Sequence, residues 1–157
     1  MFTRNSRIIL APCLLFLFIL LCPTTGASAA EYASIAKDGV NVRSGPDNDK
    51  EILWEVFTGF PLQILDRQGK WAQVVDFEGD KGWVYAPLLN KTQTVIVKGN
   101  DVNLRVGPST NYEVIATVKY GVVFVPQERE GTWIKVKHTD GTIGWLHESL
   151  LWPASLP

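Results

Sequence analysis

The stretch VNVRSGP at residues 40–46 returns as VNLRVGP at residues 102–108. The spacing from Asn41 to Asn103 is longer than the repeats of solenoids and propeller blades, and it has the size of a very small domain. We therefore predict one folding unit in two copies, at residues 31–91 and 92–157. The same offset relates further motifs without a gap: Gly-x-Trp at 69–71 and 131–133, and Gly-Trp-Val at 82–84 with Gly-Trp-Leu at 144–146.

The N-terminus has the organisation of an export signal. Arg4 and Arg7 form a basic start, an apolar run covers residues 8–21, and Ala-Ser-Ala at 27–29 offers a cleavage site of small residues. The apolar run is short for a membrane span, which needs about 20 residues. We expect residues 1–29 to be a cleaved signal peptide, so the mature protein is exported to the periplasm, the cell envelope or the medium. Contact with a membrane is then limited to the segment before cleavage.

Two alternatives for this segment are an uncleaved anchor and a lipoprotein attached at Cys22. A small residue is expected before a lipid-bearing cysteine, whereas Leu21 stands there. Cys13 and Cys22 are the two cysteines of the chain and both lie in this segment. Cleavage would leave a mature protein without thiols or disulfides, which is held together by packing alone.

The charge and the histidines bear on possible ligands. The chain after residue 29 carries 13 basic and 16 acidic residues without an evident basic cluster, so nucleic acid is not an expected partner. The two histidines, His138 and His147, are expected on opposite faces of one hairpin, so no metal site is predicted. No cofactor is expected either.

The pattern of the chain indicates β-structure throughout. Short apolar runs alternate with glycine-bearing turns at regular spacing, which is typical of sandwiches and barrels. Pro126 falls inside one expected strand and predicts an edge or a bulge there. In the second copy we expect strands near 94–98, 101–106, 113–118, 122–128, 132–138 and 142–147, with those of the first copy at the equivalent positions of the repeat.

The hairpin after Trp133 has two possible registers. Asp-Gly at 140–141 is a strong signal for a tight turn. A three-residue loop places Val136 opposite Leu146, whereas a two-residue loop places Val136 opposite Trp145. We favour the first, because it separates aliphatic from amphipathic side chains. It puts these residues on the outer face: Trp133, Lys135, Lys137 and Trp145, with Trp71, Gln73, Val75 and Trp83 in the first copy.

These motifs together resemble the bacterial SH3 domains (SH3b) of exported proteins. The resemblance rests on Val-Asn-Val/Leu-Arg-x-Gly-Pro, Gly-x-Trp-x-x-Val, Gly-Trp-Val/Leu and a closing Leu-Leu, and it covers both copies. It implies an all-β fold of two tandem small SH3-like β-barrels, each of five or six strands. It also implies a non-catalytic role, often cell-wall binding beside a hydrolase domain. No such domain is expected within residues 31–157, which leaves the partner open.

Each copy carries an Asn–Arg pair, Asn41 with Arg43 and Asn103 with Arg105. The pair alternates with an apolar residue, so both side chains should point out of the barrel, beside a long loop at 45–51 or 107–113. They could hydrogen-bond a ligand. Alternatively, the asparagine caps the loop backbone and the arginine pairs with a nearby carboxylate.

Aromatic side chains are the other candidates. Exposed rings stack on sugars and on peptide surfaces, whereas in a small barrel they could equally cover the core. Trp152, just after the second copy, is expected to pack back as a lid. Trp54 has Ala116 as its counterpart in the repeat, so it is specific to the first copy. The aromatic candidates for ligand binding are Trp71, Trp83, Tyr85 (whose counterpart is His147), Trp133 and Trp145.

Two function classes remain after catalysis is set aside. The chain after residue 29 has no cysteine nucleophile and shows no motif for a serine nucleophile, so we do not expect an enzyme. The favoured hypothesis is an exported tandem module that binds peptidoglycan or another envelope polymer, since two tethered weak sites gain affinity. The alternative is an adaptor that binds an envelope protein.

Overall fold

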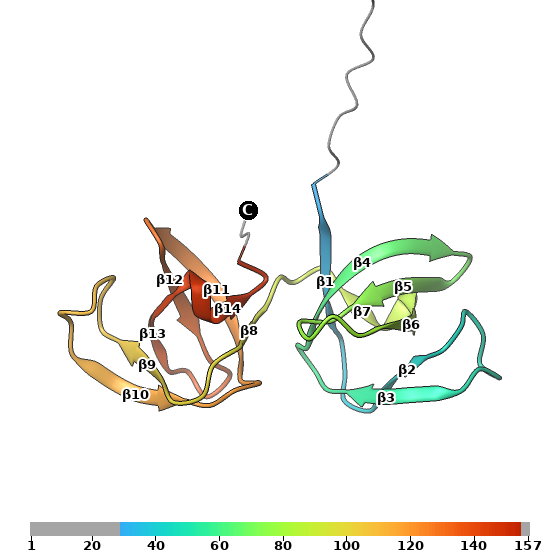
Figure 1. Ribbon diagram of the computed structural model, residues 1–157, viewed down its shortest axis with the longest axis horizontal. Helices are drawn as coiled ribbons and strands as arrows, with labels where there is room; N and C mark the ends of the chain where they lie inside the picture. Colours follow the sequence, from blue (N-terminus) through green and yellow to red (C-terminus); the bar gives the residue numbers. More distant parts are fainter. Residues whose placement is uncertain (1–28, 155–157) are drawn as a thin grey trace, which may run out of the picture.

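The computed structural model describes residues 29–154, which form two antiparallel sheets of seven strands each (Figure 1). The first sheet contains β1 (Glu31–Ile35), β2 (Val40–Arg43), β3 (Ile52–Val56), β4 (Pro61–Gln68), β5 (Trp71–Val75), β6 (Lys81–Tyr85) and β7 (Leu89–Asn90). The second contains β8 (Val95–Val97), β9 (Val102–Arg105), β10 (Val114–Val118), β11 (Val123–Glu130), β12 (Trp133–Lys137), β13 (Ile143–His147) and β14 (Leu151–Trp152). The predicted all-β fold class is confirmed.

The two sheets share one strand order, β3-β2-β6-β5-β4-β1-β7 in the first and β10-β9-β13-β12-β11-β8-β14 in the second. A single 3-10 turn precedes the last strand of each sheet, η1 (Ala86–Leu88) and η2 (Glu148–Leu150). We call each curled sheet, with its core, a barrel. The predicted strands are present, and the short strand after each 3-10 turn was not predicted.

Alternation along the strands fills each core with aliphatic side chains. In β5, Ala72 and Val74 are fully buried, whereas Trp71 and Gln73 are half-buried on the other face. Val84 of β6 is likewise buried, as the sequence predicted. In the second barrel, Ile134 and Val136 of β12 lie inward with Leu146 of β13. The predicted assignment of side chains to the inner face is therefore correct.

The glycine of each Gly-Trp-Val/Leu motif is required by a close approach of two strands. A Cβ on Gly82 would lie 3.1 Å from the carbonyl oxygen of Arg43, and one on Gly144 would lie 3.0 Å from that of Arg105. Contacts of this length with backbone atoms are tighter than most real Cβ contacts. Glycine therefore lets β2 cross β6, and β9 cross β13, at short range.

Both predicted registers of the second hairpin are wrong. Ile134 lies opposite Leu146 and Val136 opposite Gly144, a shift of two residues from the favoured pairing. The reason is a wider turn over residues 138–142, in which the backbone N–H of His138 donates to the carbonyl of Thr142 (2.8 Å). Because the shift is even, every side chain keeps its predicted face. The predicted irregularity at Pro126 is confirmed, since the β11–β12 register slips just after it.

One strand serves both barrels. Val95 and Val97 of β8 are fully buried in the second core, whereas Ile96 between them is 1 % exposed and belongs to the first core. Successive side chains of a strand point to opposite faces, so β8 contributes to two cores at once. In Figure 1, β8 runs between the barrels, on the side of the second that faces the first.

Hydrogen bonds from side chains join the barrels around this strand. The hydroxyl of Thr94 donates to the carbonyl oxygen of Gly59 (2.7 Å), and that of Ser34 donates to the carbonyl of Thr92 (2.7 Å). The Thr94 and Ser34 side chains are both buried. A buried hydrogen-bonded polar group fixes geometry, so these contacts hold the short linker in one arrangement.

Aromatic rings also cross between the barrels. The Tyr120 ring lies 5.3 Å from that of Phe77, and its hydroxyl donates to Glu78 Oε1 (2.6 Å). The Trp152 ring meets Tyr32 edge-on at 5.5 Å. The expectation that Trp152 covers its own copy is therefore wrong: it packs against the first core, because β14 pairs with the shared strand β8.

Several residues at this contact differ between the two copies. The equivalent positions of the other copy carry other side chains: Ser34 for Ile96, Thr58 for Tyr120, Thr139 for Phe77, Asn90 for Trp152 and Thr94 for Tyr32. The contact is heterologous, with a different surface from each barrel. The large side chains at these five positions thus make contacts with the other barrel, and Ile96 is buried in the first core.

The expected signal peptide, Met1 to Ala29, lies almost entirely outside the described residues. Within residues 29–154, no helix is long and apolar enough to cross a membrane.

Candidate functional site

The predicted Arg and Trp residues of each copy are neighbours on the outer face of the sheet. Arg43 of β2 lies opposite Trp83 of β6, which lies opposite Gln73 of β5. In the second barrel, Arg105 of β9 lies opposite Trp145 of β13. Directly paired residues of adjacent strands share a face and touch, so each copy presents a lateral row of a guanidinium and an indole.

Each arginine of this row holds the long loop beside it. The Arg43 guanidinium donates from Nη1 to the carbonyl oxygen of Lys50 (2.7 Å), and Arg105 donates in the same way to Tyr112 (2.8 Å). Neither arginine forms an ion pair within residues 29–154, so the expected pairing with a carboxylate is wrong. The loop carbonyl takes that place, which fixes the loop against the sheet while further guanidinium N–H groups remain.

The asparagines do not cap the loop backbone. Within the described residues, the side chains of Asn41 and Asn103 have no hydrogen-bond partner, and Asn103 is exposed. An amide carries two donors and an acceptor with two lone pairs. These side chains are therefore available to a ligand next to the loop.

In the second barrel several candidates line one hollow. Its volume is about 330 Å³, and its walls include Asn103, Arg105, Thr110, Trp133 and His147. Two strands, the loop and the end of β13 therefore converge on one concave surface. The structure thus brings together the polar pair and one of the two tryptophans predicted for this copy.

An aromatic pair marks the equivalent place in both barrels. Trp71 meets Tyr85 edge-on with ring centroids 5.6 Å apart, and Trp133 meets His147 at 5.4 Å. All four side chains are half-buried. Each pair combines an apolar ring face with polar N–H or O–H groups, as in sites that bind sugars and peptides.

Trp145 stands apart from this hollow. It is only 7 % exposed, and the ammonium group of Lys135 lies 5.8 Å from its ring centroid. The ring is thus covered by a cation on its outer side. Trp83, its counterpart, remains half-buried beside Gln73, which carries no charge.

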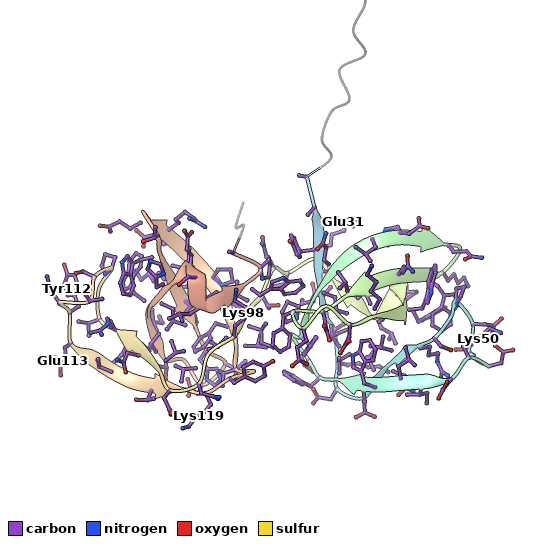
Figure 2. The ribbon with its side chains drawn as sticks, in the orientation of Figure 1. Glu31, Lys50, Lys98, Tyr112, Glu113 and Lys119 are labelled. Atoms are coloured by element: carbon purple, nitrogen blue, oxygen red, sulfur yellow. The ribbon has the colours of Figure 1, made fainter. Side chains whose placement is uncertain are left out.

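The two long loops lie at opposite ends of the molecule. In Figure 2, Lys50 marks one end of the long axis, and Tyr112 and Glu113 mark the other. The candidate surfaces are therefore separated along the length of the protein rather than joined into one site.

Hydrogen bonds to two carboxylates in hairpin loops shift the pKa values of Asp140 and Tyr120. The backbone N–H of Thr142 donates to Asp140 (2.8 Å), which lowers the pKa of that carboxyl to about 2. The hydrogen bond to Glu78 raises the pKa of the Tyr120 phenol to about 12.

One acidic cluster was not predicted. Oxygen atoms of Asp76, Glu78 and Asp80, in the loop between β5 and β6, all lie within 4.8 Å of one another. The alternating Asp-x-Glu-x-Asp pattern is visible in the sequence. The wider turn that brings the three carboxylates together was missed, because the loop was expected to hold fewer residues.

A comparison with protein families agrees with this architecture. The model described as "Bacterial SH3 domain" matches residues 36–91 and again residues 98–153. The chain belongs to the bacterial SH3 domain family. Each match coincides with one of the two barrels, so the tandem SH3b organisation predicted from the repeat is confirmed.

Among curated proteins, the chain is similar to YrvJ of Bacillus subtilis, named as a candidate N-acetylmuramoyl-L-alanine amidase. The two are 33 % identical over 155 residues, which cover 91 % of this chain and 30 % of the relative. The chain thus spans less than a third of that protein's length.

Solved structures give weaker likenesses. NlpC1 from Trichomonas vaginalis is 15 % identical with a TM-score of 0.37, covering 87 % of this chain and 50 % of that one. An NlpC/P60 family protein from Bacillus cereus is 15 % identical with a TM-score of 0.36, covering 76 % and 55 %.

Proposed function

We propose that this chain is an exported, non-catalytic tandem SH3b module that binds peptidoglycan or another polymer of the cell envelope. Membership in the bacterial SH3 domain family supports a binding role, and the similarity to an amidase-named protein supports the cell wall as its place of action. The binding surface is the outer face with the Asn–Arg pair and the aromatic pair, in both barrels.

The observation that carries this proposal is the hollow of the second barrel. Asn103 contributes an amide without an intramolecular partner, Arg105 contributes guanidinium N–H groups, and Trp133 contributes an aromatic wall. Such a set of a few directed polar groups beside an aromatic surface suits a sugar or peptide ligand. The same residue types recur at Asn41, Arg43 and Trp71 in the first barrel.

The arrangement of the barrels supports bivalent binding. A repetitive polymer offers many equivalent ligands, and two sites on one molecule raise the effective concentration for the second contact. Because the barrels share Ile96 and several hydrogen bonds, the distance between the sites is set by the structure rather than by a flexible linker. The module would then select ligands spaced along an extended polymer.

The first experiment is co-sedimentation of residues 31–157 with purified peptidoglycan sacculi. Single barrels are unsuitable controls, since removal of the second barrel would also remove Ile96 from the first core. We therefore compare the whole protein with Trp71→Ala, Trp133→Ala and the double variant. Each single change should weaken sedimentation, and the double change should abolish it.

A control variant tests whether the loss of binding is specific to the proposed surface. Leu65→Ser alters an exposed residue of β4 that lies outside the hollow and the two long loops. It should sediment like the unaltered protein. Absence of sedimentation by the unaltered protein at every salt concentration would reject the wall polymer and direct the search to envelope proteins.

A further inference from the structure

A second concave surface lies at the other side of the first barrel, away from the aromatic pair Trp71–Tyr85. Its volume is about 440 Å³, and it runs between the end of β3, the β5–β6 loop and the edge of the second barrel. Ile96 and Gly121 of the second barrel form part of its wall. We call it the acidic groove, because four of its lining residues are carboxylates: Glu55, Asp76, Glu78 and Asp80.

Within the described part of the chain, no ion pair neutralises the acidic groove. No basic residue lines it, and within residues 29–154 none of its four carboxylates forms an ion pair. By contrast, Glu31, Glu128 and Glu148 elsewhere on the surface each pair with an arginine or a lysine. The acidic groove therefore concentrates a field that favours a cation from outside.

Aromatic rings form the apolar part of the same surface. Phe57 meets Phe60 edge-on at 5.5 Å, and Phe60 meets Phe77 at 5.9 Å. Phe57 is 45 % exposed, although a ring of this size is normally buried. Ring faces attract cations and also accept aliphatic chains, so this wall suits a ligand that carries both.

The second barrel provides an internal comparison. It has a hollow of about 260 Å³ at the equivalent positions of the repeat. There Thr117 replaces Glu55, His138 replaces Asp76 and Thr142 replaces Asp80, so that Asp140, the counterpart of Glu78, is the one carboxylate kept.

The apolar wall differs between the two hollows as well. Ala116 replaces Trp54 and Lys119 replaces Phe57, so a cation stands in the second barrel where the first has a ring. The concave shape is thus common to the two copies, whereas the concentration of carboxylates and the Trp–Phe wall are specific to the first.

Trp54 adds an observation that does not depend on charge. It lines the acidic groove, and its indole Nε1 is buried without a hydrogen-bond partner. It is the only such side-chain atom within residues 29–154. The half-buried Trp54 ring therefore gives the groove an aromatic wall that Ala116 cannot supply in the second barrel.

We propose that the acidic groove of the first barrel binds a peptide that carries a free primary ammonium group on an aliphatic side chain. The ammonium lies among Glu55, Glu78 and Asp80, and the aliphatic stem packs on Phe57 and Phe77. This site is separate from the outer face proposed above, and it does not require that face to bind a polymer.

The surroundings favour an organic cation over a metal ion. Asp76 already accepts the backbone N–H groups of Glu78 and Asp80 through one oxygen (2.9 Å each), and Glu78 accepts the Tyr120 hydroxyl. These bonds reduce the free oxygen ligands, whereas Ca²⁺ takes six to eight. The aromatic wall offers no ligand to a hard cation but contributes to the binding of an alkylammonium.

The test is an NMR titration of residues 31–157 with the tripeptide acetyl-Ala-Lys-Ala-amide. The matched probe is the same tripeptide with an acetylated lysine side chain, which removes the charge and keeps the stem. We expect millimolar binding, with shifts at the Trp54 indole and the amides of residues 76–80. The acetylated probe should bind at least fivefold more weakly.

Variants locate the site without altering the loop that Asp76 organises. Glu55→Gln and Asp80→Asn remove exposed charges, and each should weaken binding by about two- to fivefold, the range for an exposed ion pair. Glu113→Gln, an exposed carboxylate of the second barrel outside both hollows, should have no effect.

Three results would overturn the proposal. Equal binding of the acetylated probe would show that the charge is not recognised. Shifts confined to the second barrel would place the peptide elsewhere. Shifts at residues 76–80 with Ca²⁺ and none with the lysine probe would identify a metal site instead. Failure of sedimentation with sacculi, by contrast, would affect only the outer-face proposal.

Discussion

Replacing Ile96 by alanine tests the claim that a strand of the second sheet completes the first core. The side chain is 1 % exposed and belongs to the hydrophobic cluster of the first barrel. The change removes three carbon atoms, or about 2.4 kcal/mol at about 0.8 kcal/mol each. The remaining cavity raises the cost, and buried Ile→Ala changes span about 2–5 kcal/mol. We expect a loss of about 3 kcal/mol in the free energy of unfolding.

The assay must report on each barrel separately. Hydrogen exchange followed by NMR gives the opening free energy at each amide, so that β5 reports on the first barrel and β12 on the second. Ile96→Ala should lower protection in β5. The matched control is Val97→Ala in the same strand, fully buried in the second core, which should lower protection in β12.

If the barrels unfold as one unit, each variant would lower amide protection in both β5 and β12. The shared strand allows that outcome. The decisive observation is the response of β5 to Ile96→Ala. If its protection is unchanged while that of β12 falls, then Ile96 acts within its own barrel and the shared core does not exist in solution.

Three further predictions concern single residues. Gly82→Ala should cost several kcal/mol in denaturant unfolding, because the new methyl meets a backbone carbonyl at about 3.1 Å; a change within about 0.5 kcal/mol would contradict the close strand crossing. Ultraviolet titration should show a Tyr120 pKa of about 12, and Glu78→Gln should lower that pKa. The stabilisation from the Tyr120–Glu78 hydrogen bond should be present below pH 10 and lost as pH rises through 12. The carboxyl of Asp140 has a lowered pKa of about 2, so its contribution is present above pH 4 and lost as pH falls through 2; Asp140→Asn should flatten this part of the acid unfolding curve, and an unchanged curve would contradict the bond from Thr142.

Much of the candidate site could be predicted because the repeat serves as an internal alignment. A residue type that recurs at the equivalent position of the other copy is marked as part of the shared unit, and strand alternation then assigns its face. Recurrence in the repeat and strand alternation together predict that Arg43 and Trp83 share the outer face, as do their equivalents in the second copy. Which atoms the arginine contacts could not be predicted, since that depends on how the loop ending near Lys50 folds back over the sheet.

The acidic groove could not be located in this way. Its walls come from β3, the β5–β6 loop and the second barrel, which are distant along the chain. Glu55 and Asp80 have no sequence relation that would indicate proximity. Their counterparts in the second copy differ, so the repeat carried no signal for them either.

The sequence by itself determined the two barrels, the inner and outer faces of their strands, and the glycines at their turns. These features depend on local rules, namely the period of two along a strand and the backbone freedom of glycine. Only the tertiary structure decided which outer residues are covered by the other barrel. In Val-Ile-Val at 95–97, alternation directs Ile96 away from its own core, but the burial of that side chain depends on a surface formed by residues far away in the chain.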